Sequence, residues 1–293
     1  MSQRLKIAIV LALVLANAGL VYLVMEKMAA SQDKAAEAPP SVTPTAGPSS
    51  TTPEAEPSGE LGGEQSLVLA DDDAIFRVYG GSCSGKDLAG IGVSTDSGAT
   101  FDDVALPKDT SAVFTLTARN SRSLDLVAAR QDCKPRRFVS TDGGSVWEVA
   151  KASDIWFLDD RKRVTAPVGV VDPGCDETLT LSATNRTFAR VFCATGVLIG
   201  SNNAGRTWSR FGSLDGVKAA AYVTGRRAFA LAPDGGCATG SYSTVDAGRT
   251  WSAAGCLDAS PGRALAANRK LVAALAGNSI YISEDGGRTW SKA

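Results

Sequence analysis

The chain has 293 residues, 44% of them hydrophobic, and its 30 Lys and Arg residues nearly balance 31 Asp and Glu residues, giving a formal net charge of −1. This balance argues against a nucleic-acid partner, which an excess of basic side chains would attract. Because the sequence contains no histidine, a Ser-His-Asp mechanism cannot be assembled and a common zinc site is disfavoured. We therefore expect no metal and no other cofactor.

The N-terminal part of the sequence predicts a membrane anchor. Residues 7–25 are uncharged and mostly apolar, and this run is just long enough to cross a hydrocarbon core of about 30 Å as a helix. Arg4 and Lys6 favour a cytoplasmic segment 1–6 and an exported remainder. The alternative is a signal peptide cleaved at Ala16-Asn17-Ala18, but the apolar run continues beyond this site. We expect a single-pass cell-membrane protein with its C-terminal domain outside, or a secreted protein if cleavage occurs.

Residues 26–65 are predicted to be a disordered linker. They are rich in Pro, Ser, Thr, Ala and Glu and nearly lack large apolar side chains. Such a chain cannot bury enough surface to offset the entropy lost on ordering, and its prolines keep it extended. The linker would therefore act as a stalk that carries a domain spanning 66–293 away from the membrane, toward a partner in the envelope or outside the cell.

An octapeptide of the form Ser/Thr-x-Asp-x-Gly-x-Thr-aromatic recurs five times in the domain, starting at residues 94, 140, 201, 244 and 283. Recurrence at such intervals indicates a repeat architecture. The positions that we expect to be structural are Ser94, Asp96, Gly98, Phe101, Ser140, Asp142, Gly144, Trp147, Ser201, Asn203, Gly205, Trp208, Thr244, Asp246, Gly248, Trp251, Ser283, Asp285, Gly287 and Trp290.

Each octapeptide makes physical sense as a turn between two strands. The Asp carboxylate can accept hydrogen bonds from nearby backbone N–H groups, and the Gly can adopt a positive φ. The Ser or Thr hydroxyl can tie the arms of the turn together, while the aromatic side chain fills apolar space beside the next strand. Asn203 replaces Asp in the third copy and keeps the acceptor oxygen.

The segments between the octapeptides favour strands. Branched and aromatic runs such as Val197–Gly200 and Ser279–Ile282 lead into the octapeptides, and second runs such as Phe188–Phe192 lie further upstream. No convincing amphipathic helical period follows residue 30. The unit is therefore strand, turn, strand, octapeptide, strand, which indicates an all-β propeller.

The five octapeptides resemble the Asp-box (BNR) repeat of sialidase-like β-propellers, which also occurs in sortilin-type receptor domains and in a photosystem assembly factor. The resemblance implies that the boxes are structural rather than catalytic. About 228 residues shared among five boxes give about 46 per unit, so five blades are the first expectation. The long interval between the second and third boxes leaves room for part of a sixth blade around Ile155–Leu158 and Val164–Val171.

All six cysteines lie in the domain, and an even number in an exported domain predicts disulfides. Fifteen pairings are possible, and the sequence alone does not choose among them. Sequential pairing is one of them, and it joins Cys83 to Cys133, Cys175 to Cys193 and Cys237 to Cys256.

Because mechanisms that need histidine are excluded, the type of catalysis that remains possible is carboxylate chemistry of the kind that glycosidases use. The resemblance to sialidases implies an arginine cluster, an acidic general acid/base and a Tyr–Glu pair. Phe76-Arg77-Val78-Tyr79 resembles the motif that supplies the first of these arginines, which makes Arg77 a candidate ligand residue. Only three glutamates follow residue 66, at Glu148, Glu177 and Glu284.

We therefore expect a non-catalytic binding or scaffolding module for an envelope or extracellular protein or glycan. The alternatives are a sialidase-like glycoside hydrolase and, from the photosystem relative, an assembly factor for a membrane complex. Two basic clusters, Lys134–Arg137 and Arg161–Arg163, are candidate surfaces for an anionic polymer or simply solvated loops. Trp156 lies outside any box and is expected to pack in the core.

Overall fold

A computed structural model describes residues 65–293, and these form strands and connecting turns without any helix. Among these residues there is accordingly no helix long and apolar enough to span a membrane. The predicted segments 1–6 and 7–25, and all of the linker 26–65 except its last residue, lie outside the described residues.

The strands form six antiparallel sheets whose strands follow one another in chain order. The first sheet contains β1 (Gln65–Leu69), β2 (Ile75–Gly80), β3 (Ala89–Ser94) and β4 (Asp102–Asp103), and the second contains β5 (Thr110–Ala118), β6 (Leu124–Arg130), β7 (Pro135–Ser140) and β8 (Glu148–Ala150). The third contains β9 (Phe157–Leu158), β10 (Val164–Ala166) and β11 (Gly169–Val171), and the fourth contains β12 (Thr178–Ala183), β13 (Ala189–Cys193), β14 (Val197–Ser201) and β15 (Ser209–Ser213). The fifth contains β16 (Ala219–Tyr222), β17 (Ala228–Asp234), β18 (Cys237–Thr244) and β19 (Ser252–Leu257), and the sixth contains β20 (Gly262–Ala267), β21 (Val272–Ala276), β22 (Ser279–Ser283) and β23 (Ser291–Lys292).

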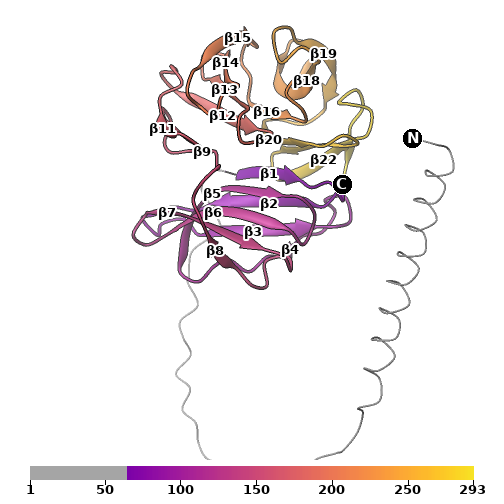
Figure 1. The fold of residues 1–293 in the computed structure, drawn as a ribbon. Helices are drawn as coiled ribbons and strands as arrows, with labels where there is room; N and C mark the ends of the chain where they lie inside the picture. Colours follow the sequence, from indigo (N-terminus) through magenta and orange to yellow (C-terminus); the bar gives the residue numbers. More distant parts are fainter. Residues whose placement is uncertain (1–64) are drawn as a thin grey trace, which may run out of the picture. The chain divides into compact units, whose positions relative to one another are not determined.

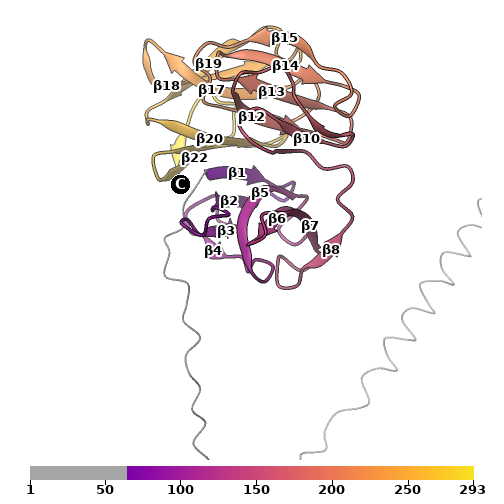
Figure 2. The same cartoon turned by 90° about the vertical axis from the view of Figure 1, so that its left-hand side faces the viewer.

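The first strand of each sheet packs beside the first strands of the neighbouring sheets. Strand β1 contacts β5 and β20, β16 contacts β12 and β20, and β9 contacts β5 and β12. Figures 1 and 2 both show β1 next to β20. These contacts close a ring of six sheets, so the predicted all-β propeller is confirmed with six blades.

The first expectation of five blades is wrong. The sixth unit lies in the long interval between the second and third boxes, where the sequence left room for it. It is the third blade of the ring, and its sheet has three strands and no box. The expectation of five blades came from counting one blade for each box, so a blade without a box was not counted as a full unit.

The core lies mainly along the second strands of the blades. All five residues of β13 and all five of β21 are buried, and all are apolar or cysteine except Arg190, whose guanidinium lies against the rings of Phe188 and Phe211. A strand covered on both faces by neighbouring sheets is expected to be continuously apolar rather than alternating. Many of the buried residues are alanines, and their small side chains let adjacent sheets approach closely.

Hydrogen bonds also join the sixth blade to the first. The amide Nδ2 of Asn268 donates to the carbonyl oxygen of Ala70 and to Oδ1 of Asp73, both at 2.9 Å. The ammonium group of Lys270 donates to Oδ2 of Asp73 at 2.8 Å. These bonds join residues about 200 positions apart in the chain and support ring closure together with the β1–β20 contact.

The boxes have the predicted turn geometry, which the sixth blade illustrates. The Ser283 hydroxyl donates to Asp285 Oδ1 at 2.8 Å and accepts from the Gly287 N–H at 2.7 Å. The backbone N–H of Thr289 donates to Asp285 Oδ1 at 3.0 Å, and its hydroxyl donates to Oδ2 at 2.7 Å. These bonds lower the pKa of Asp285 below its ordinary value of 3.8. Gly286 and Gly287 both have positive φ, at 79° and 87°.

Each box also contacts the preceding blade. Trp147 Nε1 donates to the carbonyl oxygen of Ala105 at 2.7 Å, and the Trp208 ring lies edge-on to Trp156 with centroids 6.0 Å apart. The Trp251 ring lies 5.8 Å from that of Phe192. The first box packs on the sixth blade, since Gly98 lies against Ile280 and Phe101 joins a core cluster that the first and sixth blades share. The boxes therefore connect blades as well as turn the chain.

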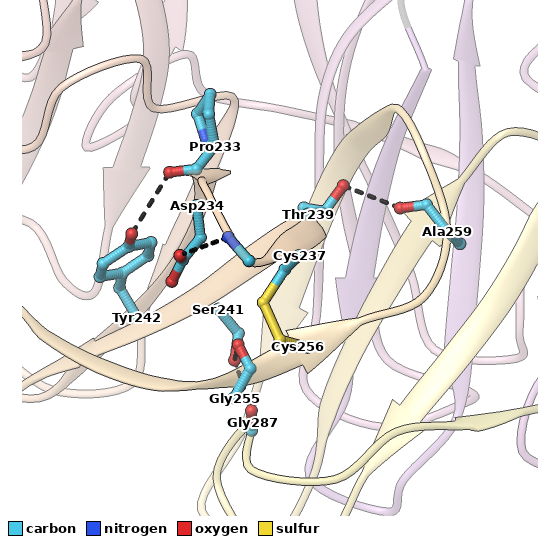
Figure 3. The surroundings of a disulfide bond; sticks show 11 residues. Pro233, Asp234, Cys237, Thr239, Ser241, Tyr242, Gly255, Cys256, Ala259 and Gly287 are labelled. Carbon is cyan, nitrogen blue, oxygen red and sulfur yellow. Dashed lines mark hydrogen bonds between the residues drawn. A yellow bond between two sulfur atoms is a disulfide. The ribbon is translucent and has the colours of Figure 1, made fainter.

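Disulfides link Cys175 to Cys193 and Cys237 to Cys256, two of the three pairs expected from sequential order. The first ties the connection after the third blade to β13, and the second ties the start of β18 to β19 within the fifth blade. Figure 3 shows the second disulfide beside Thr239, Ser241 and the turn that contains Asp234. Cys83 and Cys133, which were also expected in a disulfide, are unbonded thiols in the structure.

Candidate functional site

The innermost strands of the blades, β1, β5, β9, β12, β16 and β20, carry mainly Ala, Ser, Thr and Leu. Arg263 in β20 is the one charged residue that they contain. The three glutamates of the domain lie elsewhere: Glu148 in β8 at an outer edge, Glu177 before β12, and Glu284 in a box. Glu177 forms an ion pair with Arg161 at 2.7 Å. The innermost strands therefore do not present a cluster of arginines or carboxylates.

Arg77 lies in β2, the second strand of the first blade. Its Nη2 donates to Gln65 Oε1 on the neighbouring β1 at 3.0 Å. Its guanidinium carbon lies 5.1 Å from the ring centroid of Tyr79. These neighbours come from the same sheet and hold the side chain along it. The assignment of Arg77 to a ligand stays a prediction.

A groove of about 310 Å³ lies between the fifth and sixth blades. It is formed by the turn before β17, the turn between β20 and β21, and the box of the sixth blade; its lining includes Arg227, Phe229, Arg269, Lys270, Glu284 and Arg288. A second hollow, of about 610 Å³, shares Arg269, Lys270 and Glu284 and reaches Asp73 and Ser97 of the first blade. The turn that contains Arg269 and Lys270 thus borders both hollows. We call the first hollow the basic groove.

The basic groove carries four basic side chains against two carboxylates. Arg227, Arg269 and Arg288 are exposed, and none pairs with a carboxylate among residues 65–293. Lys270 pairs with Asp73 across the joint between the sixth and first blades. Of the two carboxylates, Asp285 is engaged in the hydrogen bonds of its box. The groove therefore offers to solvent three guanidinium groups that have no carboxylate partner among residues 65–293.

Local turn chemistry positions these arginines. The Asn268 side chain accepts hydrogen bonds from the backbone N–H groups of Lys270 and Leu271, both at 2.8 Å, which fixes the turn that presents Arg269. In the fifth blade, Thr224 Oγ1 accepts from the N–H groups of Arg226 and Arg227 at 3.2 and 3.0 Å. The Arg227 guanidinium then lies 5.2 Å from the Phe229 ring centroid. Backbone turns of the same kind thus present cations from two consecutive blades.

Sequence reasoning did not identify the basic groove, although a signal for it was present. Arg226-Arg227 and Arg269-Lys270 occupy the turn between the first and second strands of consecutive blades. Arginine also recurs at the sixth position of the last three boxes, as Arg206, Arg249 and Arg288. Alignment of the repeats would have revealed basic residues at equivalent turns.

The two basic clusters noted in the sequence are largely neutralised by neighbouring carboxylates. Arg136 pairs with Asp132 at 2.6 Å, and Arg137 pairs with Asp125 at 2.5 Å. Arg161 pairs with Glu177, and Arg163 lies 2.9 Å from Asp160. These clusters therefore offer little uncompensated charge compared with the basic groove.

Trp156 is buried, and its Nε1 donates to the Asn185 carbonyl oxygen at 3.1 Å, as expected of a packing residue. In the part of the chain that the structure describes, no group of three or more Cys, Asp or Glu side chains is arranged to hold a metal ion.

Six blades and five boxes define the class of this protein as a β-propeller of the Asp-box type. The model of the BNR/Asp-box repeat family matches residues 281–292, which comprise the box of the sixth blade and its flanking residues. No curated protein is significantly similar to the chain in sequence.

Several solved structures are similar to this chain. YCF48 bound to a D1 peptide is 14% identical with a TM-score of 0.33, over 78% of this chain and 66% of that protein, so the match spans just under two thirds of its length. The GH74 xyloglucanase of Xanthomonas campestris is 20% identical with a TM-score of 0.32, over 78% of this chain and 38% of the enzyme. An Aleuria aurantia lectin in complex with Fucα1-6GlcNAc is 11% identical with a TM-score of 0.48, over 78% of this chain and 94% of the lectin.

Proposed function

We propose that the chain is a non-catalytic binding or scaffolding module that holds an acidic group of a protein or glycan in the basic groove. The observation that carries the proposal is the convergence of Arg227, Arg269 and Arg288, none of which has a carboxylate partner among residues 65–293. A guanidinium group presents a planar array of donors that matches a carboxylate or a similar oxyanion. Three such groups from two blades favour a ligand with more than one acidic group.

A glycoside hydrolase is less well supported. Glycosidases of the usual kind place two carboxyl groups about 5–10 Å apart around the bond to be cleaved. In this propeller the innermost strands contain one charged residue, Arg263, and the three glutamates lie on separate parts of the blades. The arrangement therefore favours binding over hydrolysis.

The proposed location is outside the cytoplasm, on a stalk anchored by residues 7–25. The two disulfides support an oxidising compartment, where such bonds persist. A module held on a stalk would meet a partner in the envelope or beyond it. An assembly factor for a membrane complex is one form that such a scaffold could take.

The test is binding of two fluorescent probes to the full chain in a neutral detergent. One probe is a glutamate-rich peptide and the other is an oligogalacturonide, a glycan that carries carboxylates. The test variant is Arg269→Glu with Arg288→Glu. The control is Arg206→Glu with Arg210→Glu, which makes the same change in net charge at exposed positions of the fourth blade.

We expect at least one probe to bind, with affinity that falls as salt is raised. The test variant should weaken binding by about tenfold or more, because it loses two guanidinium contacts and adds two repelling charges. The control should change binding by less than about threefold. The probe that binds more tightly distinguishes a protein partner from a glycan. Equal losses in both variants, or no binding of either probe, would refute the proposal.

A further inference from the structure

Cys83 and Cys133 occupy equivalent turns of adjacent blades. Cys83 lies between β2 and β3 in the first blade, and Cys133 lies between β6 and β7 in the second. Because the strands are antiparallel, turns between second and third strands lie at the end of the sheet opposite the boxes. Both cysteines are therefore on the same face of the propeller, although they are 50 positions apart in the sequence (133 − 83).

The backbone brings these two turns together. Gly81, two residues before Cys83, forms a β-bridge with Ala112 in β5 of the second blade. A Cβ atom at Gly81 would lie 2.6 Å from the carbonyl oxygen of Ser111, so only glycine permits this close approach. The Ser111 hydroxyl in turn donates to the Ala129 carbonyl oxygen on β6 at 3.3 Å. The turn that contains Cys83 therefore lies beside β5, and β5 pairs with β6, the strand that leads into the turn that contains Cys133.

The backbone at Cys133 has a less common conformation. Cys133 has a φ of 56°, in the left-handed region, and its N–H donates to the Arg130 carbonyl oxygen at 2.8 Å. Glycine and asparagine are the residues that favour this conformation, and a side chain such as cysteine raises the energy of the turn. Ala204 and Ala247 adopt the same conformation elsewhere in the chain, so the turn does not require a cysteine.

We propose that Cys83 and Cys133 form a third disulfide, which joins the first and second blades on the face opposite the boxes. Both thiols lose a proton and together two electrons, and a bond forms between the two Sγ atoms. The oxidant is a disulfide, R–S–S–R, of a small molecule or of a thiol–disulfide exchange protein, and it is reduced to two R–SH molecules. The Cys133 thiolate first attacks the oxidant and releases one R–S⁻; Cys83 then attacks Sγ of Cys133 and releases the second.

The two thiols differ in a way that sets this order. Burial and the neighbouring Cys133 thiol raise the pKa of Cys83 from 9.0 to about 11. Its thiolate is therefore scarce at neutral pH, whereas Cys133 is exposed to an oxidant in solution. The Cys133 thiol is accordingly the first to react, and Cys83 completes the bond.

Peptide mapping of the full chain tests the proposal. The protein is incubated with oxidised glutathione, unpaired thiols are alkylated, and the chain is digested with trypsin without reduction. Cys83 is then carried by the peptide spanning 78–86, and Cys133 by the peptide spanning 131–136, since Pro135 blocks cleavage after Lys134. We expect these two peptides to be recovered joined, beside the pairs that contain Cys175–Cys193 and Cys237–Cys256.

Stability gives a second readout. The new bond closes a loop of about 50 residues, and oxidation is expected to raise the melting temperature by about 5–10 °C. The double variant Cys83→Ser with Cys133→Ser should show no such rise. Recovery of both peptides in alkylated form while the other two pairs are intact would overturn the proposal. So would pairing of Cys83 or Cys133 with any other cysteine.

Discussion

The hydroxyl at the first position of each box is buried and serves two hydrogen bonds at once. Ser283 and Thr244 are only 1% and 3% exposed. In the fifth blade, Thr244 Oγ1 donates to Asp246 Oδ1 at 2.8 Å and accepts from the Gly248 N–H at 3.1 Å, which matches the arrangement at Ser283. The box therefore depends on a hydroxyl at this position but tolerates the extra methyl group of threonine.

This tolerance leads to a paired prediction for Ser283. Replacement by alanine leaves the buried Gly287 N–H without its acceptor and should lower the free energy of unfolding by about 1–3 kcal/mol. Replacement by threonine keeps both hydrogen bonds and should cost less than about 1 kcal/mol. Urea denaturation of the two variants beside the parent chain measures the difference. Equal losses for Ser283→Ala and Ser283→Thr would contradict a hydrogen-bonding role.

Asn203 is a residue whose hydrogen-bonding role could be predicted in part from the sequence. The prediction that asparagine keeps the acceptor oxygen is confirmed, because Oδ1 accepts from the Thr207 N–H at 3.0 Å. Its Nδ2 also donates to Thr207 Oγ1 at 2.9 Å, whereas in the three Asp boxes that contain a threonine here the threonine hydroxyl is the donor. A hydroxyl can act in either direction, so the turn keeps its geometry without the negative charge.

At the scale of elements, glycines in the outermost strands let one blade approach the next. Gly255 in β19 lies against the carbonyl oxygens of Gly287 and Arg288 in the box of the sixth blade. The Ser241 hydroxyl lies within hydrogen-bonding distance of that same Gly287 oxygen and of the Gly255 carbonyl oxygen, and Figure 3 shows these three residues together. Gly212 in β15 makes the equivalent approach to Gly248 in the box of the fifth blade.

We therefore expect Gly255→Ala to separate the fifth and sixth blades. Its Cβ would clash with backbone oxygen atoms, which cannot move aside as a flexible side chain would. We expect a loss of about 1–3 kcal/mol in the free energy of unfolding. Gly236→Ala is the matched control, since a Cβ there has no neighbour within 4 Å. Thermal unfolding of both variants tests the argument, and a control as unstable as Gly255→Ala would contradict it.

Elements were predictable where their signal is local. Each box combines a turn former, a glycine and an aromatic residue within eight positions, so five blades could be located from the sequence. The third blade has strands of two or three residues and no box, so only its apolar runs at Ile155–Leu158 and Val164–Val171 hinted at it. Its sheet is held by packing with its neighbours, including the contact between the rings of Phe114 and Phe157 at 5.3 Å. Because this packing involves residues that are distant in the sequence, the segment that forms the third blade contains no local motif that predicts it.

At the scale of the whole molecule, the ring creates the basic groove. Arg227, Arg269 and Arg288 lie in three separate turns, and they converge because the fifth and sixth blades pack side by side. No single segment of the sequence contains this site, which explains why local motifs pointed to Arg77 and to the neutralised clusters instead. In the same ring, Arg263 is the one charged residue of the innermost strands. We therefore propose that recognition takes place in the groove and not at the central axis.

Hydrogen exchange of the full chain, with and without a saturating acidic probe, tests this assignment most directly. We expect slower exchange in peptides that cover residues 268–271 and 284–288, which line the groove. Peptides from the innermost strands β5 and β20, residues 110–118 and 262–267, should be unchanged. Protection of those innermost strands, with no change in the groove turns, would place recognition at the axis and contradict the proposed site.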